Sequence, residues 1–157
     1  MPDPITVIRE EDRPVVDFPG GATYRTLIGD DNGAGIPIRT GIQTSTPGYA
    51  TRLHSHPYVE VLTVVEGRGE AWLDGEEGTI AMEPGVTISI PAGRVHGFRV
   101  VGDRPLVTHG IHTFGKRIVN YKDEPRRRPE TDCGRCGERY RLPFPVAPGH
   151  TAAPIDL

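Results

Sequence analysis

Three potential metal ligands follow one another closely in residues 48–67. His54, His56 and Glu60 lie in a stretch that is dense in Val and Leu and bounded by glycines, a pattern that predicts β-strand. Alternate side chains of a strand point to the same face, so these positions would project two imidazoles and a carboxylate from one face. Imidazole and carboxylate together suit Zn, Mn, Fe, Co or Ni, so the segment predicts a site for one divalent transition metal without naming it.

A second segment, residues 85–96, supplies a fourth candidate ligand. It holds a β-branched run, a Pro-x-Gly turn at Pro91 and Gly93, and then His96. A turn of this kind reverses the chain, so His96 can start a neighbouring strand and face the same interior as the first three ligands. The sequence therefore predicts a metal site of three histidines and one glutamate.

The two segments resemble the two motifs of the cupin superfamily. Nine positions of this chain fall on fixed positions of those motifs, namely Gly48, His54, His56, Glu60 and Gly67 in the first and Gly85, Pro91, Gly93 and His96 in the second. One position departs, because the second motif usually closes with Asn where this chain has Val100. That Asn is not a metal ligand in the family. The resemblance, which covers residues 40–115, therefore implies that the two histidines and the glutamate of the first motif bind a metal together with the histidine of the second.

The composition favours many short strands over helices. The chain has 157 residues, of which 20 are Gly and 16 are Pro, and no long stretch shows the apolar periodicity of a helix. This length suffices for one domain with its own core. We expect strands at residues 40–46, 50–54, 59–66, 69–73, 78–82, 87–90, 97–101 and 106–113. Such a series suits an all-β protein of two facing sheets rolled into a barrel, and the resemblance implies the double-stranded β-helix, or jelly roll, of a small single-domain cupin.

Two other segments flank the barrel, which is predicted at residues 40–119. Residues 1–39 form an N-terminal arm with extended pieces at 5–9 and 22–28, which we expect to add strands to the barrel or to a partner subunit. Residues 120–157 form an irregular C-terminal extension that is rich in Pro and Arg. An arm that covers a sheet edge of a second subunit makes a homodimer the expected assembly.

The C-terminal extension contains the only two cysteines of the chain, Cys133 and Cys136, in a C-x-x-C pattern. Three interpretations stay open: a structural metal site shared within or between chains, to which His150 could add a ligand; a redox or disulfide role; and two ordinary thiols. The basic run Arg126–Arg128 is explained by a solvated segment, or by contact with an anion or a subunit.

Charge and hydropathy exclude two classes of partner. The net charge of −3 argues against nucleic acid as the main partner. No apolar run approaches the about 18 residues that a membrane span needs, and the N-terminus lacks the pattern of a signal peptide. We therefore expect a cytoplasmic protein whose partner is a small-molecule substrate.

Three further residues are candidates for catalysis. His109 and His112 have opposite parity in the predicted strand 106–113, so only one of them can face the interior. Many small cupins carry a similar pocket-lining histidine, which favours His112, and a histidine there could exchange protons with a substrate. The alternative is a histidine hydrogen-bonded within the barrel wall. Arg52 and Tyr58 lie beside the ligands in sequence, and Arg52 shares their parity and could clamp a carboxylate or phosphate.

The predicted ligand set is compatible with two kinds of catalysis. Three histidines and a carboxylate leave one or two coordination positions open in an octahedral ion. The ion could polarise a substrate carbonyl and promote isomerisation, cyclisation or elimination, or iron(II) could bring dioxygen to a chelating substrate. Cupins are known for both, and cupins with these ligands often use iron, so we favour an oxygenase or oxidase acting on a small oxygen-bearing metabolite. A third possibility is a cupin that binds a small ligand without turning it over.

Overall fold

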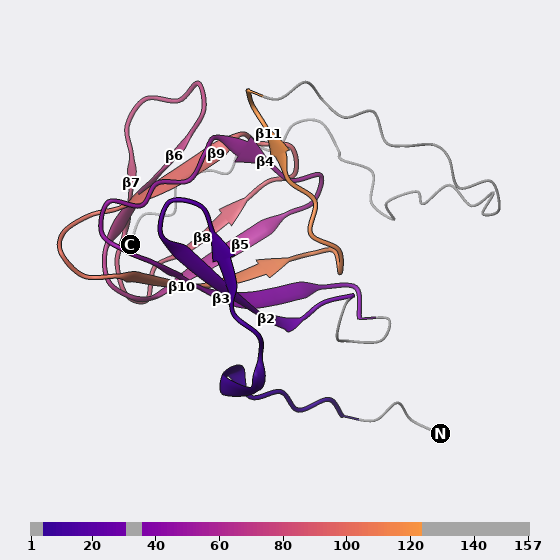
Figure 1. Ribbon diagram of the computed structural model, residues 1–157. Helices are drawn as coiled ribbons and strands as arrows, with labels where there is room; N and C mark the ends of the chain where they lie inside the picture. Colours follow the sequence, from indigo (N-terminus) through magenta and orange to yellow (C-terminus); the bar gives the residue numbers. More distant parts are fainter. Residues whose placement is uncertain (1–4, 31–35, 124–157) are drawn as a thin grey trace, which may run out of the picture. The chain divides into compact units, whose positions relative to one another are not determined.

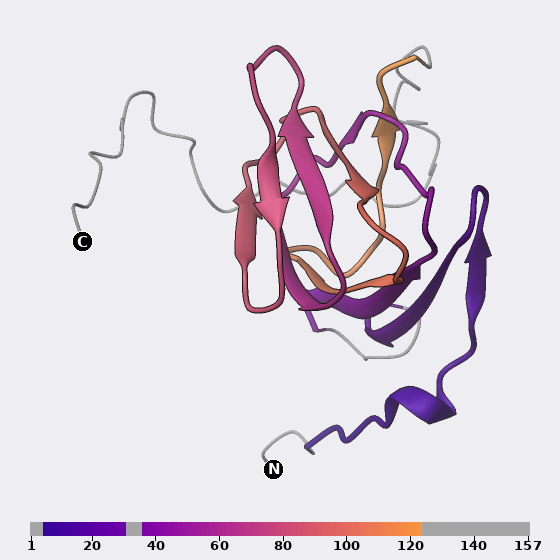
Figure 2. The same cartoon turned by 90° about the vertical axis from the view of Figure 1, so that its left-hand side faces the viewer.

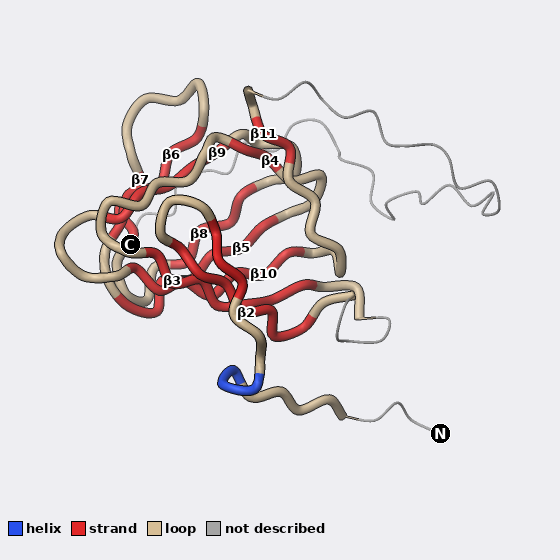
Figure 3. The backbone as a smooth tube through the Cα atoms, in the orientation of Figure 1, coloured by secondary structure: helices blue, strands red, loops and turns tan. Residues whose placement is uncertain are grey.

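The computed structural model describes residues 5–30 and 36–123. These residues form eleven β-strands in two sheets, one turn of 3-10 helix, η1 (Glu10–Asp12), and no α-helix (Figures 1 and 3). Every strand pairing is antiparallel. The all-β, jelly-roll class expected from the sequence is confirmed. No helix within the described residues is long and apolar enough to cross a membrane.

The larger sheet has six strands in the order β1-β2-β3-β10-β5-β8. Their bounds are β1 Val16–Phe18, β2 Ala22–Ile28, β3 Arg39–Ser45, β10 Leu106–His112, β5 Glu60–Glu66 and β8 Thr87–Ile90. The smaller sheet has five strands in the order β11-β4-β9-β6-β7. Their bounds are β11 Asn120–Tyr121, β4 His54–Ser55, β9 His96–Val100, β6 Gly69–Leu73 and β7 Ile80–Met82.

The inward side chains change from polar to apolar along the strands. On β10 burial alternates along the strand, so one face points inward from Leu106 to His112. On β5 the inward series begins at Glu60, which pairs with His112, and ends at Val64. The apolar ends meet in a core cluster of Ala22, Tyr49, Val64, Ala71, Met82, Phe98, Val100 and Leu106. The barrel is therefore filled by its core at one end, while polar side chains gather at the other.

Val100 and Gly67 show how two motif positions serve the fold. Val100, at the position where the family usually has Asn, is 8% exposed and belongs to the core cluster. Gly67 has a φ of +79°, and a Cβ there would lie 2.1 Å from the carbonyl oxygen of Pro105. No other residue type fits this close approach without displacement of the backbone.

The N-terminal segment contributes strands to the larger sheet of its own chain. The expected piece at 22–28 is β2, which pairs with β3, and β1 pairs with β2 across a turn at Gly20 and Gly21. Figure 2 shows the chain rising from η1 into β1 and turning back into β2. The expected extended piece at 5–9 forms no strand, and β1 was not expected. The division into arm, barrel and extension stays a prediction.

Apart from shifts of a single residue, three segments beyond the N-terminal arm differ from expectation. The strand expected at 50–54 is reduced to an isolated bridge at Ala50 followed by β4. The strand expected at 78–82 begins only at Ile80, because Gly78 has a positive φ of 91°. Residues 120–121, expected to be irregular, form β11 by pairing with β4. Cys133, Cys136 and the basic run at 126–128 lie outside the described residues.

Candidate metal centre

Two cross-strand pairs, one in each sheet, bring the polar side chains together. In the smaller sheet His54 of β4 lies opposite His96 of β9. In the larger sheet Glu60 of β5 lies opposite His112 of β10. Residues directly opposite in an antiparallel pair hold their side chains side by side. The pair in the smaller sheet therefore faces the pair in the larger sheet across the interior of the barrel.

His56 lies in the connection that carries the chain from one sheet to the other. The expectation that His54, His56 and Glu60 project from one strand face is wrong, because β4 ends at Ser55 and β5 begins at Glu60 in the other sheet. Pro57 follows His56 and cannot donate a hydrogen bond to a sheet. Gly93, in the turn before β9, donates its N–H to the carbonyl of His56 at 2.7 Å. The two motifs are thus tied to each other directly.

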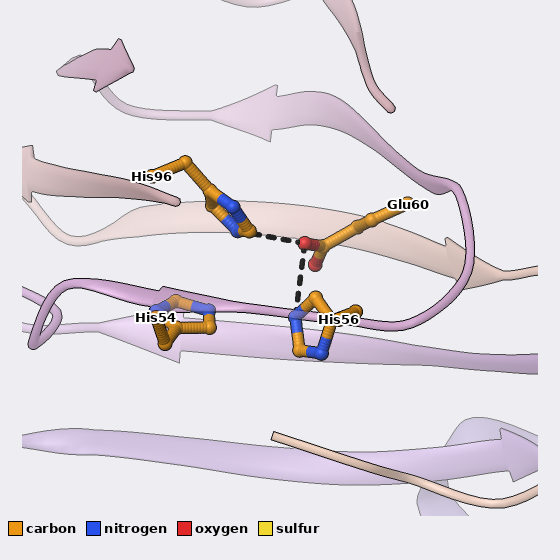
Figure 4. Close-up of side chains that lie close together, drawn as sticks. All are labelled: His54, His56, Glu60 and His96. Carbon is orange, nitrogen blue, oxygen red and sulfur yellow. Dashed lines mark ion pairs between the residues drawn. The ribbon is translucent and has the colours of Figure 1, made fainter. Parts of the chain in front are cut away.

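The four side chains converge on one point (Figure 4). One ligand atom from each of His54, His56, Glu60 and His96 lies within 4.8 Å of the ligand atoms of the others. Glu60 Oε2 is 3.2 Å from His56 Nε2 and 3.0 Å from His96 Nε2. Three of the four residues are buried, and His54 is half-buried. This spacing is short enough for a single ion to contact all four.

Backbone carbonyls fix the orientation of all three imidazoles. The Nδ1 atoms of His54, His56 and His96 lie 2.7, 2.6 and 2.9 Å from the carbonyl oxygens of Arg52, Ile118 and Arg94, respectively. A carbonyl can only accept, so each Nδ1 carries the hydrogen, and each neutral ring directs the lone pair of Nε2 inward. Metal-binding histidines are commonly held in this way.

The inward atoms lack donors. Glu60 Oε2 and His96 Nε2 are buried and form no hydrogen bond within the described part of the chain, although they are close to each other. Two acceptors at that distance repel unless a cation lies between them. The cation can be a proton on histidine or a metal ion. The residues present therefore fit a divalent transition metal, for which three nitrogens and one carboxylate are suitable ligands.

Ionisation in the metal-free protein reflects this arrangement. Burial opposes the charge of Glu60, but the hydrogen bond from His112 and the close ring nitrogens of His56 and His96 outweigh it and hold the pKa of the carboxyl well below its usual range. Burial also opposes the charge of His96, yet the nearby carboxylate of Glu60 leaves the pKa of His96 raised, because it favours the protonated ring. Burial, together with the nearby His96, lowers the pKa of His54 to about 4. His54 is therefore neutral, and ready to bind a metal, at neutral pH.

The lowered pKa of His54 predicts a pH-dependent stability in the presence of a chelator. The unfolded chain takes up a proton on His54 as the pH falls below 6.5, whereas the folded chain does so only near 4, so protons favour unfolding in that window. Relative to His54→Gln, the free energy of unfolding of the wild type should fall by about 2 to 3 kcal/mol across it. Urea titrations at several pH values measure this, with His109→Gln as control. Parallel profiles for the wild type and His54→Gln would contradict the assignment.

His112 points inward, and it carries its hydrogen on Nε2, whereas the three candidate metal-binding histidines carry theirs on Nδ1. Its Nε2 lies 3.1 Å from Glu60 Oε1, and since a carboxylate can only accept, Nε2 carries the hydrogen. His109 lies on the opposite face of β10, against Thr40. His112 thus holds one oxygen of Glu60 in place and leaves the other to face the histidines.

Tyr58 and Arg52 lie apart from the point of convergence. Tyr58 is 5% exposed and binds Ile118 twice, donating to its carbonyl at 3.1 Å and accepting from its N–H at 2.9 Å. It stacks behind His56, with the ring centroids 5.3 Å apart. Arg52 is exposed, pairs with Asp123 at 2.8 Å, and lies over the ring of Tyr121.

A cavity of about 410 Å³ opens next to the four converging side chains. It is lined by His54, His56, Glu60, His96 and His112, by Arg52 and by residues of both sheets, but not by Tyr58. The segment 117–121 supplies part of its wall through Arg117, Val119 and Tyr121. Sequence reasoning missed this segment, because a backbone carbonyl such as that of Ile118 leaves no trace in the sequence.

Comparison with known proteins shows which families and proteins the chain resembles. Residues 41–112 match the family model described as a cupin domain. A 5-nitrosalicylic acid 1,2-dioxygenase from a Bradyrhizobium species is 31% identical over 87 residues, which make up 54% of this chain and 41% of that protein. The polyketide synthase CurC of Streptomyces cyaneus is 37% identical over 84 residues, which make up 53% of each protein. The chain therefore matches only about half the length of these curated relatives.

Solved structures agree with the fold. The polyketide cyclase RemF from Streptomyces resistomycificus superposes with a TM-score of 0.66 at 24% sequence identity. The superposition covers 78% of this chain and 88% of RemF. At this identity the likeness concerns the barrel and not the reaction.

Proposed function

We propose that this chain, which belongs to the cupin superfamily through its domain at residues 41–112, is a metal-dependent enzyme acting on a small oxygen-bearing molecule. The observation that carries the proposal is the set of inward lone pairs. His54, His56 and His96 are each held by a carbonyl at Nδ1, and Glu60 Oε2 and His96 Nε2, which lie 3.0 Å apart, have no hydrogen-bond partner among the described residues. We assign these four side chains as the ligands of one divalent transition metal ion.

The protein's own residues would prepare the site for chemistry. A bound transition metal supplies Lewis-acid or redox chemistry through its open coordination positions. His112 borders the cavity and donates the hydrogen on its Nε2 to Glu60 Oε1. It is therefore the residue best placed to exchange a proton with a substrate. Tyr58 does not border the cavity, so we assign it a positioning role, in which it holds Ile118 against His56. Arg52, at the mouth, is a weaker candidate because Asp123 already neutralises it.

We favour an oxygenase or oxidase among the possible reactions. The Bradyrhizobium relative is named as a dioxygenase, and its 87 matched residues correspond to about half of this chain. The second candidate is isomerisation, cyclisation or elimination by Lewis-acid catalysis, for which a proton on His112 beside the cavity would be useful. A cupin that only binds its ligand is the third.

Oxygen uptake separates these candidates. The protein is loaded anaerobically with iron(II) and then mixed with air-saturated buffer and a panel of chelating hydroxy acids and β-diketones. We expect oxygen consumption that is matched by loss of one substrate and absent in the His54→Ala, His56→Ala variant. Conversion without oxygen uptake would contradict the oxygenase assignment and favour the Lewis-acid reaction. Binding without conversion under any metal would contradict catalysis.

We also propose that the chain forms a homodimer. Ile5 and Val7 are 92% and 81% exposed, and β1 lies at the edge of the larger sheet. Exposed apolar side chains, and an edge strand with no further neighbour among the described strands, both favour association with another subunit. The cytoplasmic location expected from the sequence stays a prediction.

A further inference from the structure

Aromatic rings form much of the wall of the cavity beyond the metal ligands. The rings that line it are Phe18, Tyr24, Tyr49, Phe98 and Tyr121. Phe18 and Tyr24 stack nearly parallel, with centroids 5.8 Å apart and an angle of 10° between their planes. Tyr24 lies directly over Gly41, where any Cβ would collide with its ring. This aromatic wall favours a ligand that itself contains an aromatic ring, because rings attract one another in offset-stacked and edge-to-face contacts.

The cavity lining also includes a cationic side chain for which the described residues provide no acidic partner. Among the charged residues that line it, Arg52 is paired with Asp123 and Glu60 belongs to the metal site. Arg117 forms no ion pair within the described residues, and its guanidinium lies over the ring of Phe18, 5.0 Å from the centroid. A guanidinium that stacks on a ring keeps its N–H edge free to bind an anion.

The charges of the site add up to a positive cavity. A divalent ion held with the single carboxylate of Glu60 would leave one positive charge, and Arg117 adds another. The field of Arg117 extends to the aromatic wall: burial raises the pKa of Tyr24 overall, while the charges of Arg39 and Arg117 oppose that rise. A cavity lined by one sign of charge concentrates ligands of the opposite sign.

We propose that the cavity binds a planar aromatic acid, whose ring lies along Phe18 and Tyr24 and whose anionic group accepts hydrogen bonds from Arg117. The proposal rests on the proposed function only in that oxygens of the ligand would also face the metal. The contacts with the aromatic rings and with Arg117 do not need the metal. Arg117 lies outside the matched domain at 41–112, on the segment that also holds His56 through Ile118. It is therefore a candidate determinant of specificity that family motifs do not include.

Calorimetric titration with two matched probes tests this inference. Salicylate and salicylamide have nearly the same shape and chelating oxygens, but only salicylate is an anion at neutral pH. The wild type, Arg117→Gln and Arg68→Gln are each titrated, both loaded with zinc and metal-free in the presence of a chelator. Arg68 is a matched control, because it is exposed and lies outside the cavity lining. Thermal melts confirm that the variants are folded.

We expect Arg117→Gln to weaken salicylate binding about tenfold and salicylamide binding by less than about threefold, with no change in Arg68→Gln. The weaker binding of salicylate by Arg117→Gln should also be seen in the metal-free protein, even if the affinity for salicylate is lower there. This result therefore does not depend on the metal assignment. The inference is overturned if the wild type binds no salicylate in either state. It is also overturned if Arg117→Gln leaves salicylate binding unchanged, or weakens both probes equally.

Discussion

Glu60→Gln is expected to lower metal affinity by at least about 100-fold while leaving the metal-free protein as stable as the wild type. The amide has the same size as the carboxylate, and its oxygen can still accept the hydrogen bond from His112. Its amino group can donate to the Nε2 atoms of His56 and His96, of which His96 Nε2 has no hydrogen-bond partner among the described residues of the wild type. The variant thus lacks the negative charge that favours binding of a metal cation, and it has an N–H donor for the histidine nitrogens.

Two measurements on the Glu60→Gln variant test these opposite effects. Competition with a chromogenic chelator for zinc gives the affinity, and urea unfolding with excess chelator at mildly alkaline pH gives the stability of the metal-free form. Glu66→Gln is the matched control, because Glu66 is the exposed residue at the other end of β5. Wild-type zinc affinity in Glu60→Gln would show that Glu60 is not a ligand. A large loss of stability in the metal-free variant would contradict the conclusion that the inward atoms of the site lack a hydrogen-bond donor.

Leu106→Ala is expected to lower the free energy of unfolding by about 3 to 5 kcal/mol. Leu106 is 0% exposed and belongs to the apolar cluster, where it packs closely over Gly69 with Met82 nearby. Deleting its methyl groups leaves a cavity that strands paired on both sides cannot close. Urea unfolding of the metal-free protein measures the loss.

The matched control for Leu106→Ala is Val101→Ala, at a residue 40% exposed, which should cost less than about 1 kcal/mol. Similar losses of unfolding free energy in the two variants would contradict the placement of Leu106 in the core and of Val101 at the surface. Metal binding by Leu106→Ala should remain in the folded fraction, because the core and the metal site occupy opposite ends of the inward series on β10.

The candidate ligands could be predicted, because histidine and glutamate side chains are themselves the groups that bind transition metals. His54, His56, Glu60 and His96 carry the spacing of the two motifs, and the chain brings all four together. The predicted route was wrong, however, because parity along a strand cannot show that the chain changes sheets between His54 and Glu60. Convergence depends on pairing between strands, and sequence periodicity describes only one strand at a time.

Features that depend on the backbone or on distant contacts could not be predicted. The carbonyl of Ile118, which orients His56 from 62 positions away, has no residue-specific signal. Two-residue strands such as β4 and β11 exist only because each finds a partner. Parity correctly required that His109 and His112 point to opposite faces, but it did not reveal that His112 would bind Glu60.

The central claim is that His54, His56, Glu60 and His96 bind one divalent transition metal ion. Elemental analysis by plasma mass spectrometry, made on the purified protein after loading and desalting, tests it most directly. The cysteine pair is present in both the wild type and the His54→Ala, His56→Ala variant, so only the barrel site differs between them. We expect close to one equivalent of metal in the wild type and a loss of about one equivalent in a folded variant. A full metal complement in that variant, or none in the loaded wild type, would contradict it.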